Sequence, residues 1–326
     1  MTPIGISLGV GENSLDERYD LVILGAGPAG LTAGIYAARA RVNHIILEKN
    51  PIPGGQIINT DIVENYPGFP EPVGGFDLME KFRQQAQNFG AKIITAPVNS
   101  LTHENSEVVI DTDEGKTRAR AVIIATGADP KKLGIPGEEK FIGRGVSFCA
   151  TCDAALYKEK VVAVIGGGDA AVEEAIFLTK FARKVYIVHR RDQLRAAKII
   201  QERAFANDKI EFVWSHIPVE VVGDDIVRGL KIQSRKDGSE KILEVDGIFI
   251  YIGLKPNTGF IKIPDLEVDD RGFVITDTEM RTNIPGLFAA GDVRSKLLRQ
   301  VSTAVGEGAT AEFAAEKYLE QTAPAG

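Results

Sequence analysis

Cys149 and Cys152, the two cysteines of this 326-residue chain, are separated by two residues, and Asp153 follows the second. Two thiols at this spacing can close a small, reversible disulfide, and an adjacent carboxylate can move the protons that dithiol chemistry requires. A zinc site would need further cysteine or histidine ligands near by, and the four histidines show no ligand spacing. A buried structural pair of thiols remains the alternative. We therefore take Cys149, Cys152 and Asp153 as candidate catalytic residues.

The composition excludes several classes of partner. The net charge of -7, the isoelectric point near 5.3 and the absence of a basic run longer than 189–191 argue against nucleic acid or an anionic membrane. No apolar run approaches the roughly 18 residues that span a bilayer. A disulfide between two closely spaced cysteines closes only a very short loop and cannot stabilise a secreted fold of this size. We therefore expect a cytoplasmic protein. Residues 1–18 have no signal-peptide pattern and are expected to form a loose extension.

The first nucleotide-binding pattern starts at residue 19. The apolar run 19–24 predicts a buried strand, GAGPAG follows at 25–30, helical spacing continues over 31–41, and a second apolar strand, 44–47, ends at Glu48. Glycines in this arrangement let a pyrophosphate approach the N-terminus of the helix, while an acid at the end of the second strand accepts hydrogen bonds from ribose hydroxyls. The pattern predicts a dinucleotide site.

The same pattern returns after residue 161, with GGGDAA at 166–171, a helix predicted to residue 181 and a strand predicted over 184–188. Glu48 lies 23 residues after Gly25 (48 − 25), and His189 lies 23 residues after Gly166 (189 − 166). The second unit thus places His189, Arg190 and Arg191, with Arg195 one turn further on, where the first has its acid. Guanidinium groups suit a 2′-phosphate and favour NADPH over NADH. A solvated charge run at a strand end is the alternative.

Two stretches rich in Gly and Pro, 127–137 and 253–259, have the composition of domain junctions. We predict an α/β fold of two Rossmann-like, three-layer ββα dinucleotide-binding domains, one inserted into the other. The predicted boundaries give an outer domain of residues 19–129 and 256–326 and an inserted domain of residues 130–255. Short strands are expected over 92–120, 121–126, 210–251 and 287–292, and helices over 76–89 and 302–319.

Taken together, GAGPAG with its acid, the glycine turn followed by arginines, and CATCD resemble the low-molecular-weight thioredoxin reductases over roughly residues 19–320. The resemblance implies FAD in the outer domain, NADPH in the inserted domain, thioredoxin as the partner and a homodimer. It also implies that Cys152 faces the flavin, that Cys149 attacks thioredoxin and that Asp153 acts as acid and base. The inserted domain would rotate to exchange nicotinamide and disulfide at one flavin face.

The resemblance also implies the cofactor-binding residues. Those for FAD are Gly25, Gly27, Pro28, Ala29, Gly30, Glu48, Gly55, Gln56, Asn65, Thr126, Gly127, Gly291, Asp292, Arg299 and Gln300. Those for NADPH are Gly166, Gly168, Asp169, Ala170, Ala171, His189, Arg190, Arg191 and Arg195.

The sequence departs from the family pattern at two positions. Ala154 replaces a glycine after CATCD, which could alter the local turn if its φ is positive, and Ala170 stands where serine is common. Alternatives with the same fold are NADH or ferredoxin as donor, or another small disulfide protein or a low-molecular-weight disulfide as acceptor. A flavin redox sensor without turnover is a third class.

Overall fold

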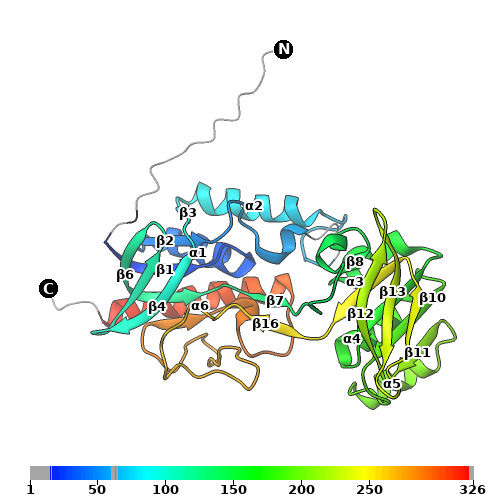
Figure 1. Cartoon of the computed structure of the whole chain (residues 1–326). Coiled ribbons are helices and arrows are strands. Elements are labelled where there is room, and N and C mark those ends of the chain that lie inside the picture. The colour runs from blue at the N-terminus through cyan, green and yellow to red at the C-terminus, as the bar shows by residue number, and fades with distance from the viewer. Residues whose placement is uncertain (1–14, 16, 60–62, 64, 323–326) are drawn as a thin grey trace, which may run out of the picture. The chain divides into compact units, whose positions relative to one another are not determined.

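The computed structural model describes residues 15, 17–59, 63 and 65–322. The chain divides into two compact units: an outer unit, which runs to Asp129 and resumes at Lys255, and an inserted unit, Pro130–Leu254. The colours of Figure 1 show that the outer unit combines the first and last parts of the chain. Most of the expected N-terminal extension falls outside the described residues, and the first strand begins at Arg18.

The outer unit is built on a seven-stranded sheet whose central strands are buried on both faces. Leu21, Val22 and Ile23 in β1 are fully buried, as expected for an apolar parallel strand. The first half of β6 pairs with antiparallel β5, and its second half pairs with parallel β17. The strand order is β3 (Ile93–Thr95), β2 (His44–Glu48), β1 (Arg18–Leu24), β6 (Gly115–Ile124), β5 (Glu107–Thr112) and β4 (Val98–Glu104), with β17 (Leu287–Ala289) beside β6.

Three helices of the outer unit contribute to one buried core against this sheet. They are α1 (Pro28–Arg39), α2 (Gly75–Asn88) and α6 (Val301–Gln321). The backbones of α1 and α6 come so close that a Cβ at Gly308 would lie 2.2 Å from the carbonyl oxygen of Ala29. The first helix is therefore fixed both by the strand before it and by the last helix of the chain.

The inserted unit has three layers. Its parallel sheet has the order β11 (Ile210–Trp214), β10 (Lys184–His189), β9 (Val161–Gly166), β15 (Gly247–Tyr251) and β8 (Val146–Ser147). Residues of α4 (Asp169–Leu178) and α5 (Lys198–Phe205) share one core with this sheet. A second core joins it to an antiparallel sheet of β12 (His216–Gly223), β13 (Val227–Ser234) and β14 (Glu240–Glu244).

The two segments that connect the units, β7 (Ala128–Pro130) and β16 (Leu254–Pro256), form a two-stranded sheet. On the inserted side, the amide of Lys131 donates to the carbonyl of Gly253 (2.9 Å). On the outer side, the amide of Asn257 donates to the carbonyl of Gly127 (3.0 Å). Each unit therefore holds its own two chain ends side by side.

Several details differ from the sequence-based expectations. The stretch 121–126 is not a separate strand, because its first residues continue β6 without a break. The helix expected to reach Phe181 ends at Leu178, and α5, β7 and β16 were not foreseen. The hairpins of the antiparallel sheet turn at 224–226 and 235–239. None of the helices in the described residues is long and apolar enough to cross a membrane.

Candidate active site

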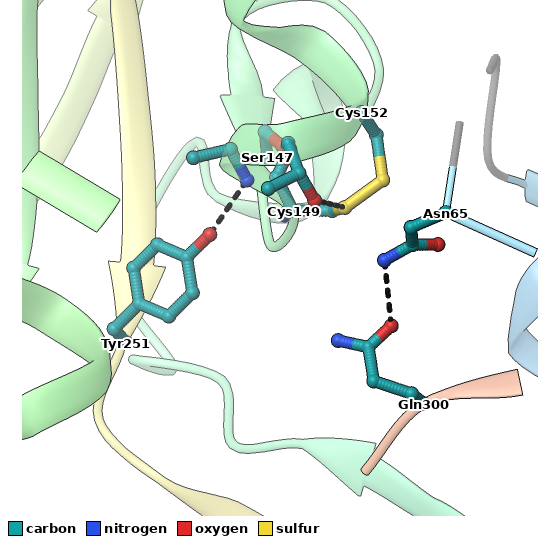
Figure 2. Close-up of a disulfide and its surroundings, with 8 residues drawn as sticks. Asn65, Ser147, Cys149, Cys152, Tyr251 and Gln300 are labelled. Carbon is teal, nitrogen blue, oxygen red and sulfur yellow. Dashed lines mark hydrogen bonds between the residues drawn. A yellow bond between two sulfur atoms is a disulfide. The ribbon is translucent and has the colours of Figure 1, made fainter. Parts of the chain in front are cut away.

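Cys149 and Cys152 are joined by a disulfide, and their Cα atoms are 5.3 Å apart (Figure 2). This separation lies in the usual range for disulfides. Both cysteines are half-buried. Cys149 precedes α3 (Ala150–Asp153), a single helical turn that contains Cys152 and ends at Asp153. The structure thus brings the three predicted catalytic residues together on one short element.

Hydrogen bonds fix the backbone on the N-terminal side of this turn. The hydroxyl of Ser147 accepts from the amide of Cys149 (3.1 Å) and lies 3.2 Å from the carbonyl of Cys149, to which it donates. The amide of Ala150 donates to the phenol oxygen of Tyr251 (2.6 Å). Ala154, which replaces the usual glycine, has φ −55° and ψ −35°. Because its φ is negative, alanine at this position causes no backbone strain.

The first glycine turn has three glycines with three different roles. Gly25 has φ +101°, and a Cβ there would lie 2.6 Å from the carbonyl oxygen of Ala125. A Cβ at Gly30 would lie 1.8 Å from the carbonyl oxygen of Gly25, so the helix could not pack on the turn. A Cβ at Gly27 would meet only Gly55, at 3.9 Å. Gly27 therefore leaves open space at the start of α1.

The N-terminus of α1 fits a dinucleotide pyrophosphate. Gly27 is the N-cap, no side chain caps the helix, and Pro28 occupies the first turn, where its missing amide hydrogen costs nothing. Ala29 is buried on the side that faces Gly291 and Gly308. The free amides of the first turn can therefore bind phosphate oxygens.

Glu48 lies at the end of β2 and holds the glycine turn. Its carboxylate accepts from the amide of Ala26 (2.7 Å) and from the amide of Asn50 (2.9 Å). Glu48 is only 5% exposed. Each carboxylate oxygen has two lone pairs, so the acid retains acceptor capacity for ribose hydroxyls.

The loop after β2 returns to the glycine turn. A Cβ at Gly55 would lie 3.3 Å from the Cα of Gly27. Gln56 in η1 (Gly55–Asn59) donates its amide to the carboxylate of Asp129 (2.5 Å). The same Asp129 oxygen accepts from the side chain of Asn257 (3.2 Å).

Asn257 also fixes the predicted Thr126–Gly127 segment. Its side chain donates to the carbonyl of Thr126 (3.0 Å), and the Thr126 hydroxyl donates to the carbonyl of Asn257 (2.7 Å). Gly127 has no heavy atom near a hypothetical Cβ, so the chain is open at this point. Asn257 could not be predicted from the sequence, because its spacing from Thr126 follows no motif.

Asn65 and Gln300, each predicted to bind FAD, are hydrogen-bonded to each other through their side chains (Figure 2). Gln300 is also the N-cap of α6. Its side chain accepts from the backbone of Thr303, and the Thr303 hydroxyl accepts from the amide of Gln300 (3.2 Å). This arrangement is a capping box.

Asp292 belongs to a cluster of charges that sequence reasoning missed. Its carboxylate lies 3.2 Å from the ammonium of Lys296, and Glu307 pairs with both Lys296 (3.3 Å) and Arg294 (3.0 Å). Glu307 also accepts from the amide of Gly291 (2.7 Å) in η4 (Gly291–Val293). Burial raises the pKa of Asp292, although Lys296 opposes this.

The side chain of Arg299 makes several contacts within its own loop. Its guanidinium donates to the carbonyls of Asp292, Lys296 and Arg294 and lies 4.2 Å from the ring centre of Phe273. Arg299 therefore shapes the loop that carries Asp292.

The second glycine turn repeats the design of the first. A Cβ at Gly166 would lie 2.5 Å from the carbonyl oxygen of Tyr251, and one at Gly167 would lie 2.5 Å from the ring of His189. At Gly168, the N-cap of α4, a Cβ would meet no heavy atom within 4 Å. Gly168 thus corresponds to Gly27 of the first turn and leaves the helix N-terminus accessible to phosphate.

The three residues after Gly168 lie in different environments. Asp169 accepts from the amide of Ala197 (2.7 Å) and so ties the turn to the loop before α5. Ala170 is exposed, whereas Ala171 is buried against Gly166.

The structure separates His189 from its neighbouring arginines. Arg190, Arg191 and Arg195 are exposed, whereas His189 is 5% exposed with its ring against Gly167. Burial, followed by the positive charges of the arginines, lowers the pKa of His189. The imidazole is thus placed to support the turn, and the guanidinium groups are placed to reach solvent or a phosphate.

Two hydrogen bonds hold the arginine loop, one from a backbone amide and one from a guanidinium side chain. The amide of Arg195 donates to the carbonyl of Gly167 (2.6 Å), and Arg235, from the hairpin between β13 and β14, donates to the carbonyl of Arg190 (3.2 Å). Arg235 was not identified from the sequence, because it lies 45 residues from Arg190.

A family model, curated relatives and solved structures all relate this chain to the same family. The family model described as "Pyridine nucleotide-disulphide oxidoreductase" matches residues 19–308. A thioredoxin reductase of Listeria monocytogenes is 48% identical over 310 residues, which are 94% of this chain and 96% of that protein. Crystal structures of thioredoxin reductases from Streptococcus pyogenes and Lactococcus lactis are 47% and 45% identical, with TM-scores of 0.80 and 0.72. The alignments cover 94% and 93% of this chain and 100% and 99% of those chains.

These relationships agree with the features found in the structure: a redox-type disulfide at CATCD and two parallel-sheet units with glycine turns. The chain therefore belongs to the pyridine nucleotide-disulphide oxidoreductase family, and within it to the low-molecular-weight thioredoxin reductases, which are flavoprotein oxidoreductases.

Proposed function

We propose that this chain passes electrons from NADPH through FAD to the Cys149–Cys152 disulfide and then to thioredoxin. One observation carries the proposal: a closed CATCD disulfide occurs in a chain with two glycine turns, each at the start of a helix. The strand after the first turn ends in Glu48, and the strand after the second leads into arginines. This difference supports a free ribose at the first site and a 2′-phosphate at the second.

Bound FAD would supply the chemistry that side chains lack, because a flavin accepts a hydride and passes two electrons to a disulfide. The chain supplies binding and orientation. In the outer unit, we assign the pyrophosphate to the amides at Gly27 and the ribose to Glu48. In the inserted unit, we assign the NADPH pyrophosphate to the amides at Gly168 and its 2′-phosphate to Arg190, Arg191 and Arg195.

Reduction of the disulfide breaks the Sγ–Sγ bond between Cys149 and Cys152 and takes up two electrons and two protons. We assign proton delivery to Asp153, which adjoins Cys152 at the end of α3. The thiolate of Cys149 then attacks one sulfur of the thioredoxin disulfide and forms a mixed disulfide. Attack by Cys152 on Cys149 releases the thioredoxin dithiol and restores the intramolecular bond.

The redox pair and the residues that we assign to NADPH belong to the inserted unit, whereas the residues that we assign to FAD belong to the outer unit. The family resemblance implies that nicotinamide and disulfide would use the same flavin face, and we therefore propose that the inserted unit rotates about β7 and β16 between two states. A covalent crosslink between the units tests this: thioredoxin turnover that continued unchanged would rule out a required rotation.

The proposed activity is tested by following NADPH oxidation coupled to thioredoxin reduction, with NADH in parallel. We expect a higher kcat/KM with NADPH, and absence of turnover with either nucleotide would contradict the proposal. Ferredoxin as donor and low-molecular-weight disulfides as acceptors are the comparison substrates. Cys149→Ser and Cys152→Ser should each retain FAD and lose disulfide reduction. Loss of flavin from both variants would instead indicate a structural role for the pair.

We also propose that the protein acts in the cytoplasm as a homodimer. The low cysteine content supports a reducing compartment, and the family resemblance supports the dimer. Sedimentation equilibrium of the FAD-loaded protein measures the oligomeric state directly.

A further inference from the structure

Tyr251 connects the second glycine turn to the redox disulfide. It is the last residue of β15, and its backbone pairs in register with Gly166 on β9. A Cβ at Gly166 would lie 2.5 Å from the Tyr251 carbonyl oxygen. The backbones of these two residues are therefore in close contact. The side chain of Tyr251 extends to α3, where its phenol oxygen accepts from the amide of Ala150 (2.6 Å, Figure 2).

The amide of Ala150 depends on this acceptor. Ala150 is fully buried and is the first residue of α3, whose N-cap, Cys149, provides no side-chain hydrogen bond. The nearby Ser147 hydroxyl serves the amide of Cys149 instead. A buried donor that loses its acceptor destabilises the conformation that keeps it buried.

The phenol is held in its neutral form. Burial raises the pKa of Tyr251, and the negative charge of Glu174 acts in the same direction. The oxygen of a neutral phenol has lone pairs, one of which accepts from the Ala150 amide.

We propose that Tyr251 is a positioning residue that stabilises the disulfide form of Cys149–Cys152 relative to the dithiol. The inference rests on the redox role proposed for these cysteines. When the Sγ–Sγ bond is closed, the four-residue ring holds Ala150 in its buried position. When two electrons and two protons have opened the bond, the segment is released and the Ala150 amide can reach water. Loss of the Tyr251 oxygen therefore costs the disulfide form more than the dithiol.

The test compares the FAD-loaded wild type with Tyr251→Phe. Each protein is equilibrated in dithiothreitol buffers of known potential, the free thiols are alkylated, and the dithiol fraction is measured by mass spectrometry. We expect Tyr251→Phe to shift the equilibrium about tenfold toward the dithiol, which corresponds to a potential about 30 mV less negative. An unchanged potential would overturn the proposal, even if the variant were less stable to heat.

Tyr157→Phe is the matched control, because Tyr157 lies in the adjacent η3 (Ala154–Tyr157) and packs its ring on Phe249 (5.2 Å). Its potential should stay at the wild-type value, and an equal shift would also overturn the proposal. Ala150→Pro removes the donor at a helix position that tolerates proline, after a residue with the extended backbone that proline requires (φ −142°, ψ 100°).

In the Ala150→Pro background, Tyr251→Phe should no longer shift the potential toward the dithiol. A shift as large as in the wild-type background would show that the Ala150 bond is not its cause. Thiol trapping needs neither NADPH nor thioredoxin. Failure of the proposed electron transfer would therefore appear in turnover assays without affecting this result.

Discussion

The side chains of Asn65 and Gln300, 235 residues apart in the sequence, meet through a 3.1 Å hydrogen bond. Gln300 also caps α6. One residue thus ties the loop after the first nucleotide-binding pattern to the last helix of the chain. Because both residues were predicted to lie along the flavin, this pair allows cofactor binding and helix capping to be tested separately.

Gln300→Ala should weaken flavin binding and lower the free energy of unfolding by about 1 kcal/mol, because α6 loses its N-cap. Asn65→Ala is the control, since it breaks the same side-chain bond and leaves the cap intact. Flavin released into an ultrafiltrate and urea unfolding are the two measurements. If both variants lost the same stability, capping by Gln300 would contribute nothing measurable.

Alanine substitutions in the first glycine turn should separate folding from binding. Gly30→Ala places a Cβ 1.8 Å from the carbonyl of Gly25 and should prevent normal folding. Gly27→Ala meets only Gly55 at 3.9 Å, so the protein should fold but bind FAD weakly, because the added methyl group would occupy the proposed pyrophosphate position. Soluble yield, thermal unfolding and flavin content distinguish the two. A Gly27→Ala protein with full flavin content would disprove the assigned phosphate position.

Arg190→Ala and Arg191→Ala should each reduce kcat/KM for NADPH by about 10- to 100-fold, since a charge-assisted hydrogen bond contributes about 1.5–3 kcal/mol. The value for NADH should change less than about twofold, because NADH lacks the 2′-phosphate. Arg203→Ala, on the exposed side of α5, provides the control. An equal loss with both nucleotides would mean that the arginines do not read the phosphate.

His189→Ala should behave differently from the arginine variants. The ring of His189 lies under Gly167, so its removal should lower thermal stability and impair both nucleotides alike. A selective loss of NADPH activity would instead place His189 at the 2′-phosphate.

Glu312 should make stability depend on pH. It is 1% exposed, and burial, reinforced by Glu316, raises its pKa from 4.5 to about 7. Between these values the folded protein keeps the proton that the unfolded chain releases, so the free energy of unfolding should fall as pH rises. Glutamine does not titrate. In Glu312→Gln, we therefore expect the fall in unfolding free energy with rising pH to be smaller by on the order of 1–2 kcal/mol, after allowance for solvent screening.

Urea unfolding at about pH 5 and about pH 8 measures this contribution of Glu312. Glu320→Gln, an exposed change on the same helix, should leave the pH dependence as in the wild type. If Glu312→Gln gave the same pH dependence as Glu320→Gln, the Glu312 carboxyl would already be ionised in the folded protein.

Much of the fold could be predicted because local patterns encode it. The apolar runs before Gly25 and Gly166 became β1 and β9, and the 23-residue spacing to Glu48 and His189 located the ends of β2 and β10. Such signals depend on residues close in sequence. The sequence therefore located the glycine turns and the redox pair.

Other features depend on contacts between distant segments and left no local signal. The side chains of Asn257 and Arg235 donate to backbone carbonyls of residues that are remote in the sequence. Tyr251 looks like the end of an ordinary buried strand, and only the fold shows its phenol at Ala150. The burial of His189 could not be predicted either, because it depends on how closely the glycine turn packs over its ring.

The paired chain ends at β7 and β16 have a consequence for the modularity of this protein. Lys131 is bonded to Gly253 within the inserted unit, and Gly127 is bonded to Asn257 within the outer unit. At the crossover, the two chain ends of each unit are therefore hydrogen-bonded to each other. A short linker from Gly127 to Asn257 could replace residues 128–256, and the excised piece would carry its own neighbouring termini. The inserted unit thus interrupts the outer unit between two residues, Gly127 and Asn257, that are already hydrogen-bonded neighbours.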